Sequence, residues 1–465
     1  MTFGTVFLDD CLPPERVSRT DADRTERSID WGTDEADAVM PDAVVWPEST
    51  EEVSAVLTAA NERGVPVTPY AAGTSLEGNA VPVEKGISMD LSQMDAVHEI
   101  RPDDRQVDVG PGILGDEMND AVEKHGLFLP ALPSSGAIST IGGMLANDAS
   151  GMKTVKYGEV GDWALELEAV LPSGEVITAG SKAVKTSAGY NLKELLIGSE
   201  GTLAVITRVT LQLAGRPQQV WGGRATFGSV EDAASAVADA IRSGVDVAKI
   251  ELIDELSVDI ANEHLDTDLP VAPTVFLEFH ANHGIETEVE FCKSVFEGHG
   301  VEEFDVTESD EKMAEFWAAR RELADALEPY RDDLSLKTPG DVTVPISNYP
   351  EILAYAKQLG EEQDLLVSCF GHAGDGNLHY NILLDKDDPE QVAASEEVSK
   401  QIVHRAIELG GTATGEHGVG LGKQEYLEPE HGSAAVEVMR GIKRTFDPNG
   451  ILNPGKVFPS DPSEE

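Results

Sequence analysis

The sequence is poor in cysteine and in basic residues, and both shortages exclude classes of protein. Only three cysteines occur among 465 residues, and Cys11, Cys292 and Cys369 lie far apart. No disulfide framework or thiolate zinc site can be built at such spacings, which fits a reducing compartment. The 34 Lys and Arg residues are outnumbered by 85 Asp and Glu, so the formal net charge is −51. We expect no nucleic-acid partner, because its phosphates would be repelled.

Long apolar runs are missing as well. No stretch approaches the roughly 20 apolar residues of a membrane-spanning helix. The N-terminus carries Asp9 and Asp10 and lacks a basic flank before an apolar run, so no secretory signal is expected. We therefore expect a cytoplasmic protein that is at most peripheral to the inner face of a membrane. The composition leaves the oligomeric state open, with a homodimer among the alternatives.

The acidic residues are scattered along the chain, as Asp103–Asp104, Glu302–Glu303 and Asp387–Asp388 illustrate. At low salt their mutual repulsion would strain the compact state. This pattern predicts a halophilic protein, with an ordinary acidic mesophile protein as the alternative. Hydrophobic residues still make up 41% of the chain, which argues against disorder and is enough for two or three domains with sizeable cores.

For the first 217 residues, the pattern predicts an irregular or helical lead-in over 1–40, followed by an α/β region. Ser49 and Glu52 have the spacing of a capping box, which predicts the start of a helix that Gly64 ends. A hairpin is predicted where apolar residues alternate and then turn. The expected strands are 43–46, 65–68, 87–91, 107–109, 165–171, 176–178 and 203–213, with a helix at 115–125.

From about residue 218 the pattern changes to repeated strand–helix units, which predict two-layer α+β packing. The expected strands are 220–227, 247–253, 273–280 and 301–306, and the expected helices are 230–242, 310–328 and 432–446. Met313, Phe316, Trp317 and Leu323 form the expected core face of the helix at 310–328.

Two loops rich in small residues, Pro69–Asn79 and Pro133–Gly143, stand out in the first region. Their backbone N–H groups, with the hydroxyls of Thr74 and Ser75, could wrap a phosphate or pyrophosphate. Either loop alone could be an ordinary turn. Together they predict the walls of a flavin dinucleotide site.

The residues richest in chemistry lie near the C-terminus. His372 and His379 are separated by glycines, and Glu416 and His417 follow about forty residues later. Two imidazoles and a carboxylate suit Zn²⁺ with open positions for a substrate. The alternative is that each histidine donates to a nearby carbonyl. His417 could act as a base near neutral pH, or it could be a solvated loop residue.

The roles of two cationic side chains are ambiguous from the sequence alone. Arg320 is expected on a helix beside Arg321 and Glu315, which favours a surface ion pair of little worth. Lys337 precedes the strand-like stretch 341–344 and has no further local signal.

The ordered set of these motifs resembles the FAD-linked oxidases of the vanillyl-alcohol-oxidase fold. The resemblance is nearest to the D-lactate dehydrogenases of the cytochrome type, the glycolate oxidase FAD subunits and the D-2-hydroxyglutarate dehydrogenases. It spans about residues 40–458 and rests on the order of the motifs along the chain. Besides the two loops, the motifs are 187–192, 198–203, 251–255, 273–279, 341–347, 371–381, 415–420 and 453–456.

The resemblance implies an α+β fold with four parts. A lead-in of residues 1–40 precedes a two-subdomain FAD-binding domain of the PCMH type at 41–217. An α+β substrate, or cap, domain with an antiparallel sheet covers 218–415. A C-terminal helical segment, 416–465, returns to the FAD domain and completes the active site.

The resemblance also implies the residues that hold FAD. These are Pro69, Ala72, Gly73, Thr74, Ser75, Gly78, Asn79, Pro133, Ser139, Thr140, Gly142, Gly143, Asn147, Gly151, Glu200, Gly201, Ile206 and Asn453. Members with covalent flavin use a histidine near the first loop, and none occurs there, so FAD is expected to be non-covalent. Relatives often have glycine where this chain has Ala71, Ser75 and Asn79, and Ala71 would be strained if that position needs a positive φ.

For the chemistry, the family pattern implies a divalent metal, usually zinc, on His372, His379 and Glu416, with His417 as the catalytic base. Substrate contacts fall on Arg320, Asn381 and Lys337. The expected reaction is oxidation of a D-2-hydroxy acid, D-lactate first, with electrons passed to a quinone, a cytochrome or an electron-transfer flavoprotein. Glycolate or D-2-hydroxyglutarate as substrate is the alternative within the family, and a non-catalytic flavin-binding subunit is the alternative outside catalysis.

Overall fold

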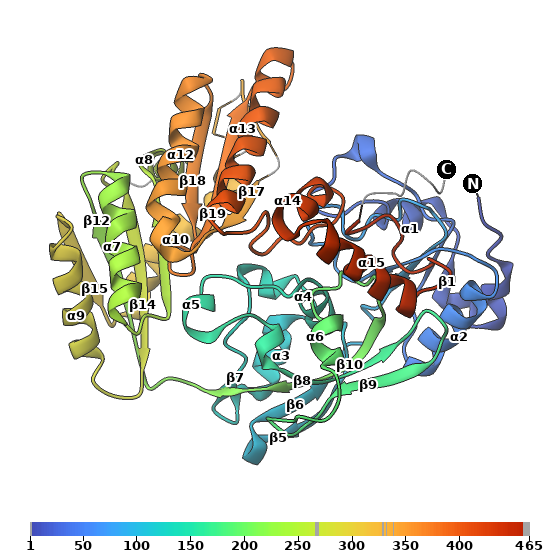
Figure 1. Cartoon of the computed structure of the whole chain (residues 1–465). Coiled ribbons are helices and arrows are strands. Elements are labelled where there is room, and N and C mark those ends of the chain that lie inside the picture. Colours follow the sequence, from blue (N-terminus) through green and yellow to red (C-terminus); the bar gives the residue numbers. More distant parts are fainter. Residues whose placement is uncertain (1, 266–268, 328–329, 332, 338, 459–465) are drawn as a thin grey trace. The chain divides into compact units, whose positions relative to one another are not determined.

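The computed structural model describes residues 2–265, 269–327, 330–331, 333–337 and 339–458. The chain divides into two compact units, and both are discontinuous in sequence (Figure 1). Unit 1 comprises the described residues of 1–150, 159–216 and 416–465. Unit 2 comprises residues 151–158 and the described residues of 217–415.

Unit 1 contains a four-stranded sheet of order β1-β2-β4-β3. Its strands are β1 (Val17–Ser18), β2 (Ala43–Val45), β3 (Val67–Tyr70) and β4 (Ile87–Asp90). Strands β2 and β3 both pair with β4 in parallel, whereas β1 is antiparallel to β2. The predicted cap is present: the Ser49 side chain accepts the Glu52 N–H at the start of α2 (Thr50–Asn61), whose apolar face is buried.

A second sheet in unit 1 is antiparallel throughout, with the order β5-β6-β10-β8-β9. The strands are β5 (Val97–Arg101), β6 (Gln106–Val109), β8 (Ala164–Val170), β9 (Val176–Gly180) and β10 (Val205–Gln212). The predicted hairpin is β8–β9, and its inward residues join a core with helices α3 (Gly115–Glu123) and α4 (Ile141–Asn147). The remaining elements of unit 1 are α1 (Asp21–Glu26), α3 (Gly115–Glu123), β7 (Leu127–Phe128), α4 (Ile141–Asn147), α6 (Leu192–Leu196), β11 (Ala214–Gly215), α14 (Leu427–His431) and α15 (Ser433–Phe446).

Unit 2 is built on an antiparallel eight-stranded sheet. The order is β15-β12-β14-β13-β18-β19-β16, with β17 also paired to β19. The strands are β12 (Gln219–Thr226), β13 (Lys249–Ile253), β14 (Thr274–Ala281), β15 (Glu303–Thr307), β16 (Ser335–Leu336), β17 (Gly340–Thr343), β18 (Leu366–Gly371) and β19 (Asn377–Leu384).

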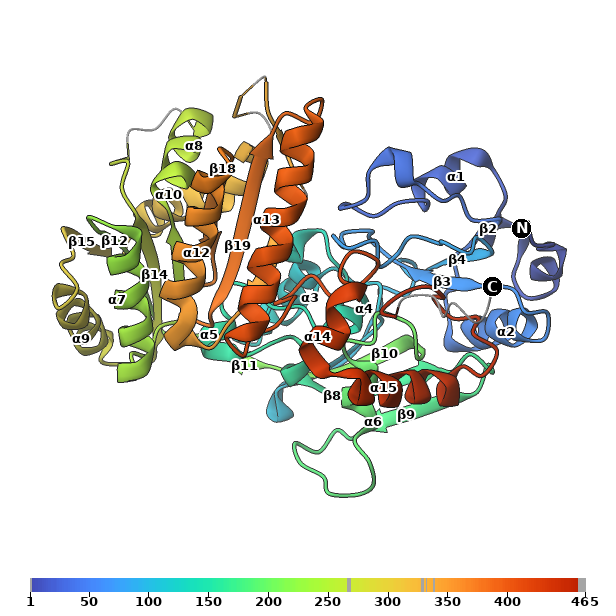
Figure 2. The same cartoon turned by 45° about the horizontal axis from the view of Figure 1, so that its top comes forward.

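Helices cover both faces of this sheet (Figure 2). One face carries α7 (Val230–Ser243), α9 (Ile285–Glu297), α12 (Tyr349–Glu362) and α13 (Pro389–Glu408). The other carries α8 (Glu255–Leu265), α10 (Asp310–Arg321) and α11 (Leu323–Leu327), which share one core with Ile253, Phe276 and Phe370 of the sheet. The short helix α5 (Thr154–Tyr157) also belongs to unit 2. Because side chains alternate along a strand, Glu251 lies on the same face as Ile253, toward α10.

Four sequence predictions need correction. The two-layer packing predicted for the second region is wrong, because helices cover both faces of its sheet. The helix predicted over 310–328 is two helices, α10 and α11, separated at Glu322, and residue 328 lies outside the described residues. The strand predicted at 65–68 is shifted to Val67–Tyr70, so Pro69 lies inside β3, where it pairs with Met89. The lead-in is more ordered than expected, since β1 adds a strand to the parallel sheet.

Candidate flavin and substrate site

The first small-residue loop follows β3 in unit 1. Gly73 and Gly78 adopt positive φ angles of 64° and 75°, whereas Ala71, Ser75 and Asn79 are not among the positive-φ residues. The expected strain at Ala71 is therefore absent. The left-handed backbone positions of this loop are thus occupied by glycine. The three positions that depart from the family pattern do not need a left-handed backbone.

The second loop meets the first through hydroxyl groups. The Oγ atoms of Ser139 and Thr74 lie 3.0 Å apart, and Ser139 donates to Ser135 at 2.9 Å. The Thr140 side chain caps α4 by accepting the Gly143 N–H at 3.2 Å. A Cβ on Gly142 would lie 2.5 Å from the Pro111 side chain, so this glycine is needed for packing. Pro133 precedes the short helical turn Ser134–Ala137.

Glu200 joins the C-terminal segment of unit 1 to the first loop. Its carboxylate accepts the Asn79 side-chain amide at 2.6 Å and the backbone N–H groups of Val419 and Gly420 at 2.7 and 2.9 Å. Asn453 donates to the carbonyls of Asn79 and Glu200 at 3.0 and 2.7 Å. Burial raises the pKa of Glu200, and these donors oppose the rise. The predicted residues Asn79, Glu200 and Asn453 thus shape the cradle through bonds to one another.

The Glu416–His417 pair is fixed by the end of α4. The Asn147 amide donates to the Glu416 carbonyl at 2.5 Å, and the Ser150 hydroxyl donates to the Glu416 carboxylate at 3.4 Å. His417 Nδ1 lies 3.6 Å from a carboxylate oxygen of Glu77. A Cβ on Gly418 would fall 2.5 Å from Asn147 Oδ1, so only glycine fits beside this pair. Gly201 has a positive φ of 65°, and Ile206 is buried on β10.

In unit 2 a single buried carboxylate holds two predicted site residues. Glu251 Oε2 accepts the Arg320 Nε–H at 2.8 Å, and Glu251 Oε1 lies 2.7 Å from His372 Nδ1. The Arg320 guanidinium also lies over the Phe370 ring, 4.7 Å from its centre. Arg320 is buried, so the surface ion pair considered for it from the sequence is wrong. One edge of its guanidinium carries Nε, and the other can fork around a carboxylate.

The two predicted histidine ligands lie side by side. The rings of His372 and His379 are 5.3 Å apart between centres and nearly perpendicular. His372 follows β18, and His379 lies on β19 opposite Phe370. The tight turn between these strands brings both imidazoles to one end of the hairpin, as the glycines predict.

Asp341 organises the chain that leads to Glu416. This buried carboxylate accepts Asn377 Nδ2 at 2.7 Å, Thr414 Oγ1 at 3.0 Å and the Gly415 N–H at 2.8 Å. Its Oδ1 lies 3.9 Å from His379 Nδ1. Residue 416 follows directly in the sequence and belongs to unit 1.

The remaining predicted residues have less defined surroundings. Asn381 is buried and donates to the Ser368 carbonyl at 3.3 Å, while its Oδ1 has no hydrogen-bond partner within the described part of the chain. Burial lowers the pKa of Lys337, which lies next to the end of β16. Gly151 belongs to unit 2, unlike the other predicted flavin residues.

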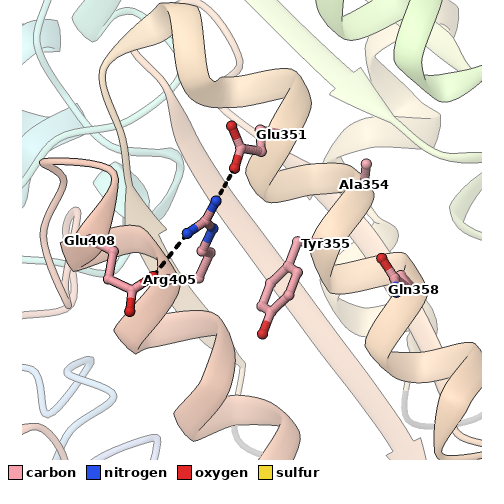
Figure 3. Close-up of a pocket in the computed structure, with 6 residues that line it drawn as sticks. All are labelled: Glu351, Ala354, Tyr355, Gln358, Arg405 and Glu408. Carbon is pink, nitrogen blue, oxygen red and sulfur yellow. Dashed lines mark hydrogen bonds and ion pairs between the residues drawn. The ribbon is translucent and has the colours of Figure 1, made fainter.

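A hollow elsewhere in unit 2 has no part in this site. It lies between α12 and α13 and is lined by Glu351, Ala354, Tyr355, Gln358, Arg405 and Glu408 (Figure 3). Its only cation, Arg405, is paired with Glu351 and with Glu408. None of the predicted site residues lines it.

Sequence reasoning missed the residues that orient the site: Glu251, Glu77 and Asp341. Glu251 and Asp341 were noticed only as parts of motifs. Each is an acidic residue in a strand that also contains apolar or β-branched residues. If such a strand is buried, an unpaired charge would be costly, so a partner is expected.

Comparison with known proteins defines the class. Residues 216–457 match the family of FAD linked oxidases, C-terminal domain, and residues 41–180 match an FAD binding domain. The chain belongs to the FAD-linked oxidases, as the motifs indicated. It is therefore an FAD-dependent oxidoreductase, and the prediction of FAD as cofactor is confirmed at that level.

Curated relatives indicate the type of FAD-dependent oxidoreductase. The chain is 39% identical over 424 residues to a mitochondrial D-lactate dehydrogenase [cytochrome] of Arabidopsis thaliana, covering 90% of this chain and 74% of that protein. It is 34% identical over 425 residues to the glycolate oxidase subunit GlcD of Bacillus subtilis, covering 91% of this chain and 90% of that protein. The enzyme is thus of the type that includes D-lactate dehydrogenase and GlcD.

Solved structures confirm the predicted fold class. A p-cresol methylhydroxylase with substrate bound superposes with a TM-score of 0.78 at 17% identity, covering 98% of this chain and 96% of that one. An alkyldihydroxyacetonephosphate synthase gives 0.76 at 21% identity over 97% and 85% of the two chains. In the part of the chain that the structure describes, no helix combines the length and apolar character needed to cross a bilayer.

Proposed function

We propose that this protein oxidises a small D-2-hydroxy acid, with D-lactate as first candidate, to the corresponding 2-oxo acid. The observation that carries the proposal is the pair of bonds that Glu251 makes to Arg320 and His372. One carboxylate orients a guanidinium suited to an organic acid and an imidazole suited to a metal. The names of the curated relatives, D-lactate dehydrogenase and glycolate oxidase subunit, support the same substrate class.

Arg320 is proposed to bind the substrate carboxylate. Its Nε is occupied by Glu251, and Phe370 supports one face of the guanidinium. A planar group held on one edge and one face keeps a fixed direction for a bidentate contact, which a lysine could not reproduce. Lys337 is proposed as a second carboxylate partner. Asn381, with a buried Oδ1 that lacks a hydrogen-bond partner among the described residues, is proposed to touch the substrate.

A divalent cation, with zinc as first candidate, is proposed to be held by His372, His379 and Glu416. The donor set fits such an ion, because two imidazoles and one carboxylate leave coordination positions open. The contact from Glu251 to Nδ1 of His372 is also the second-sphere support that metal-binding histidines usually have. A cation held there would polarise the substrate hydroxyl and lower its pKa.

The small-residue loops of unit 1 are proposed to hold FAD without a covalent bond. The fit rests on the chemistry of the cradle: left-handed glycines expose backbone N–H groups, and the hydroxyls of Thr74 and Ser139 converge. Asn147 and Asn453 each keep a buried Oδ1 without a hydrogen-bond partner in the described residues, which suits a polar ligand. FAD supplies the acceptor for the substrate's α-hydrogen as hydride.

His417 is proposed to be the catalytic base. Its Nδ1 lies 3.6 Å from a carboxylate oxygen of Glu77, and the neutral imidazole would accept the hydroxyl proton of the substrate. The positive Arg320 would attract an anionic substrate that the acidic surface repels. FAD bound in the cradle would pass the electrons on to a quinone, a cytochrome or an electron-transfer flavoprotein.

The experiment is a substrate panel assayed with an artificial acceptor at molar salt and at low salt. We expect the highest kcat/KM with D-lactate and negligible turnover of L-lactate. Glycolate is the second candidate, because GlcD proteins match this chain over nearly its whole length. A preference for glycolate would replace D-lactate by another 2-hydroxy acid as the substrate. No turnover of any 2-hydroxy acid would refute the proposal and favour a non-catalytic flavin-binding subunit.

A further inference from the structure

The N-terminal lead-in lies outside both regions that match the family, which cover residues 41–180 and 216–457. Nothing in those matches assigns it a role. In unit 1, however, residues 28–33 of the lead-in lie along the first flavin loop. We call residues 28–33 the N-terminal brace.

Backbone bonds join the brace to the loop. The Trp31 N–H donates to the Gly73 carbonyl at 2.9 Å, and the Gly32 N–H donates to the Ser75 carbonyl at 3.1 Å. A Cβ on Gly32 would fall 2.0 Å from the Leu76 carbonyl oxygen. The two backbones therefore approach as closely as glycine alone allows.

The only carboxylate of the brace, Asp30, makes the side-chain contact to the loop. Asp30 is 3% exposed, and its Oδ2 accepts the Ser75 hydroxyl at 2.8 Å. Its Oδ1 accepts the Thr33 hydroxyl at 2.5 Å. The Ser75 proton thus points at Asp30, and this hydrogen bond ties the loop to the brace.

The brace is itself anchored to the parallel sheet. The Val39 N–H donates to the Ser28 carbonyl at 3.0 Å. Just before the brace, Arg27 donates to Asp90 at the end of β4 through Nε and Nη2, at 3.1 and 2.9 Å. A segment anchored at its N-terminal end in this way can hold the loop in one shape.

A buried cation from the other end of the chain interacts electrostatically with the same carboxylate. Burial lowers the pKa of Lys456 to about 8, against the opposing charges of Asp30 and Glu200. Lys456 also donates to the Val81 carbonyl, just beyond the loop. Both termini of the chain thus contribute charged groups around the loop.

We propose that Asp30 is a positioning residue for the flavin: through Ser75 it fixes the loop 71–79 so that the loop's backbone N–H groups are arranged for the dinucleotide before it binds. A loop that is already ordered loses less conformational entropy on binding, so the affinity is higher. The lead-in is in this sense part of the FAD site.

The test measures the FAD dissociation constant of the holoenzyme and its variants from the fluorescence of flavin released on dilution, at fixed salt. Asp30→Ala is expected to raise the constant about tenfold. The matched control is Asp42→Ala. Asp42 is also a buried carboxylate near the N-terminus, but it accepts the N–H groups of Phe3 and Gly86, away from the flavin loop. The FAD dissociation constant of Asp42→Ala should stay within about twofold of that of the parent protein.

A double-mutant cycle separates positioning from a general loss of stability. If Asp30 acts through Ser75, the variants Asp30→Ala and Ser75→Ala and the double variant should all weaken FAD binding by about the same factor. Additive effects, an unchanged constant in Asp30→Ala, or an equal rise in Asp42→Ala would overturn the proposal. Should Asp30→Ala fail to fold, Asp30→Asn and Ser75→Ala carry the same test, and unchanged FAD binding in both would overturn it. No substrate is needed, so the result is independent of the proposed reaction.

Discussion

The carboxylate of Glu251 accepts a hydrogen bond from Arg320 at 2.8 Å, while its second oxygen lies 2.7 Å from His372. Glu251 is fully buried in the middle of β13. Its charge is therefore little screened, and it fixes the direction of both partners. The proposed anion-binding and metal-binding groups of unit 2 thus depend on one buried side chain.

We predict that Glu251→Gln weakens metal binding by about 10- to 100-fold, because the second-sphere charge on His372 is lost. It should also raise KM, since Arg320 loses its partner, while FAD content is unchanged. Metal titration after chelation, followed by kinetics, measures both effects. Glu278→Gln is the matched control: Glu278 is also a buried strand carboxylate, but it binds Lys249 and His280. Equal loss of metal affinity in both variants would show that burial of a charge, and not contact with His372, is responsible.

Arg320→Lys tests recognition of the substrate carboxylate. A lysine keeps the charge but cannot make the forked contact or stack on Phe370 in the same way. We expect KM for D-lactate to rise by at least tenfold, corresponding to about 1.4 kcal/mol, with flavin content preserved. Arg321→Lys, one position along α10, should behave like the parent. A parental KM in Arg320→Lys would exclude this residue as the carboxylate partner.

His417→Ala should keep the yellow cofactor and lose turnover, because the proton acceptor is removed while the flavin cradle remains. A loss of about 100-fold or more in the rate of flavin reduction is expected for a general base. His431→Ala, at the end of α14, serves as the control. Persistent activity in His417→Ala would mean that another group takes the proton.

The stability of the protein should depend on pH through Glu278. Burial acts to raise its pKa, but the hydrogen bond with His280 and the charge of Lys249 outweigh burial and hold it at about 2, below its ordinary 4.5. A lowered pKa means that this stabilisation is present above about pH 4.5 and is lost as the pH falls toward 2. The difference in unfolding free energy between the parent and Glu278→Gln should therefore shrink by up to about 3 kcal/mol over that range. Denaturant titrations at several pH values measure it, and a difference that does not change with pH would contradict the assignment.

Local sequence signals predicted the elements that depend on neighbours in the chain. The cap at Ser49, the buried face of α2 and the β8–β9 hairpin follow from periodicity and turn residues within about a dozen positions. The proximity of the His372 and His379 rings was also predictable, since only a short turn separates the two residues.

The orienting contacts could not be predicted in this way, because their partners are distant in sequence. Glu251 is 69 residues from Arg320 and 121 from His372. Within β13 it alternates with apolar residues, a pattern that equally fits an exposed strand face. Arg320 likewise follows a helical pattern with other charges nearby, which favours a solvent position. Only the packing of α10 onto β13 reveals that both are buried.

The central claim is that D-lactate delivers its electrons to the flavin, and anaerobic reduction of the bound cofactor tests it most directly. The purified holoenzyme is mixed with D-lactate in the absence of oxygen and of any acceptor, and the flavin absorbance near 450 nm is followed, with L-lactate as control. We predict rapid bleaching with D-lactate, none with L-lactate, and loss of the D-lactate response after the metal is chelated. A flavin that stays oxidised with D-lactate, glycolate and D-2-hydroxyglutarate alike would contradict the account.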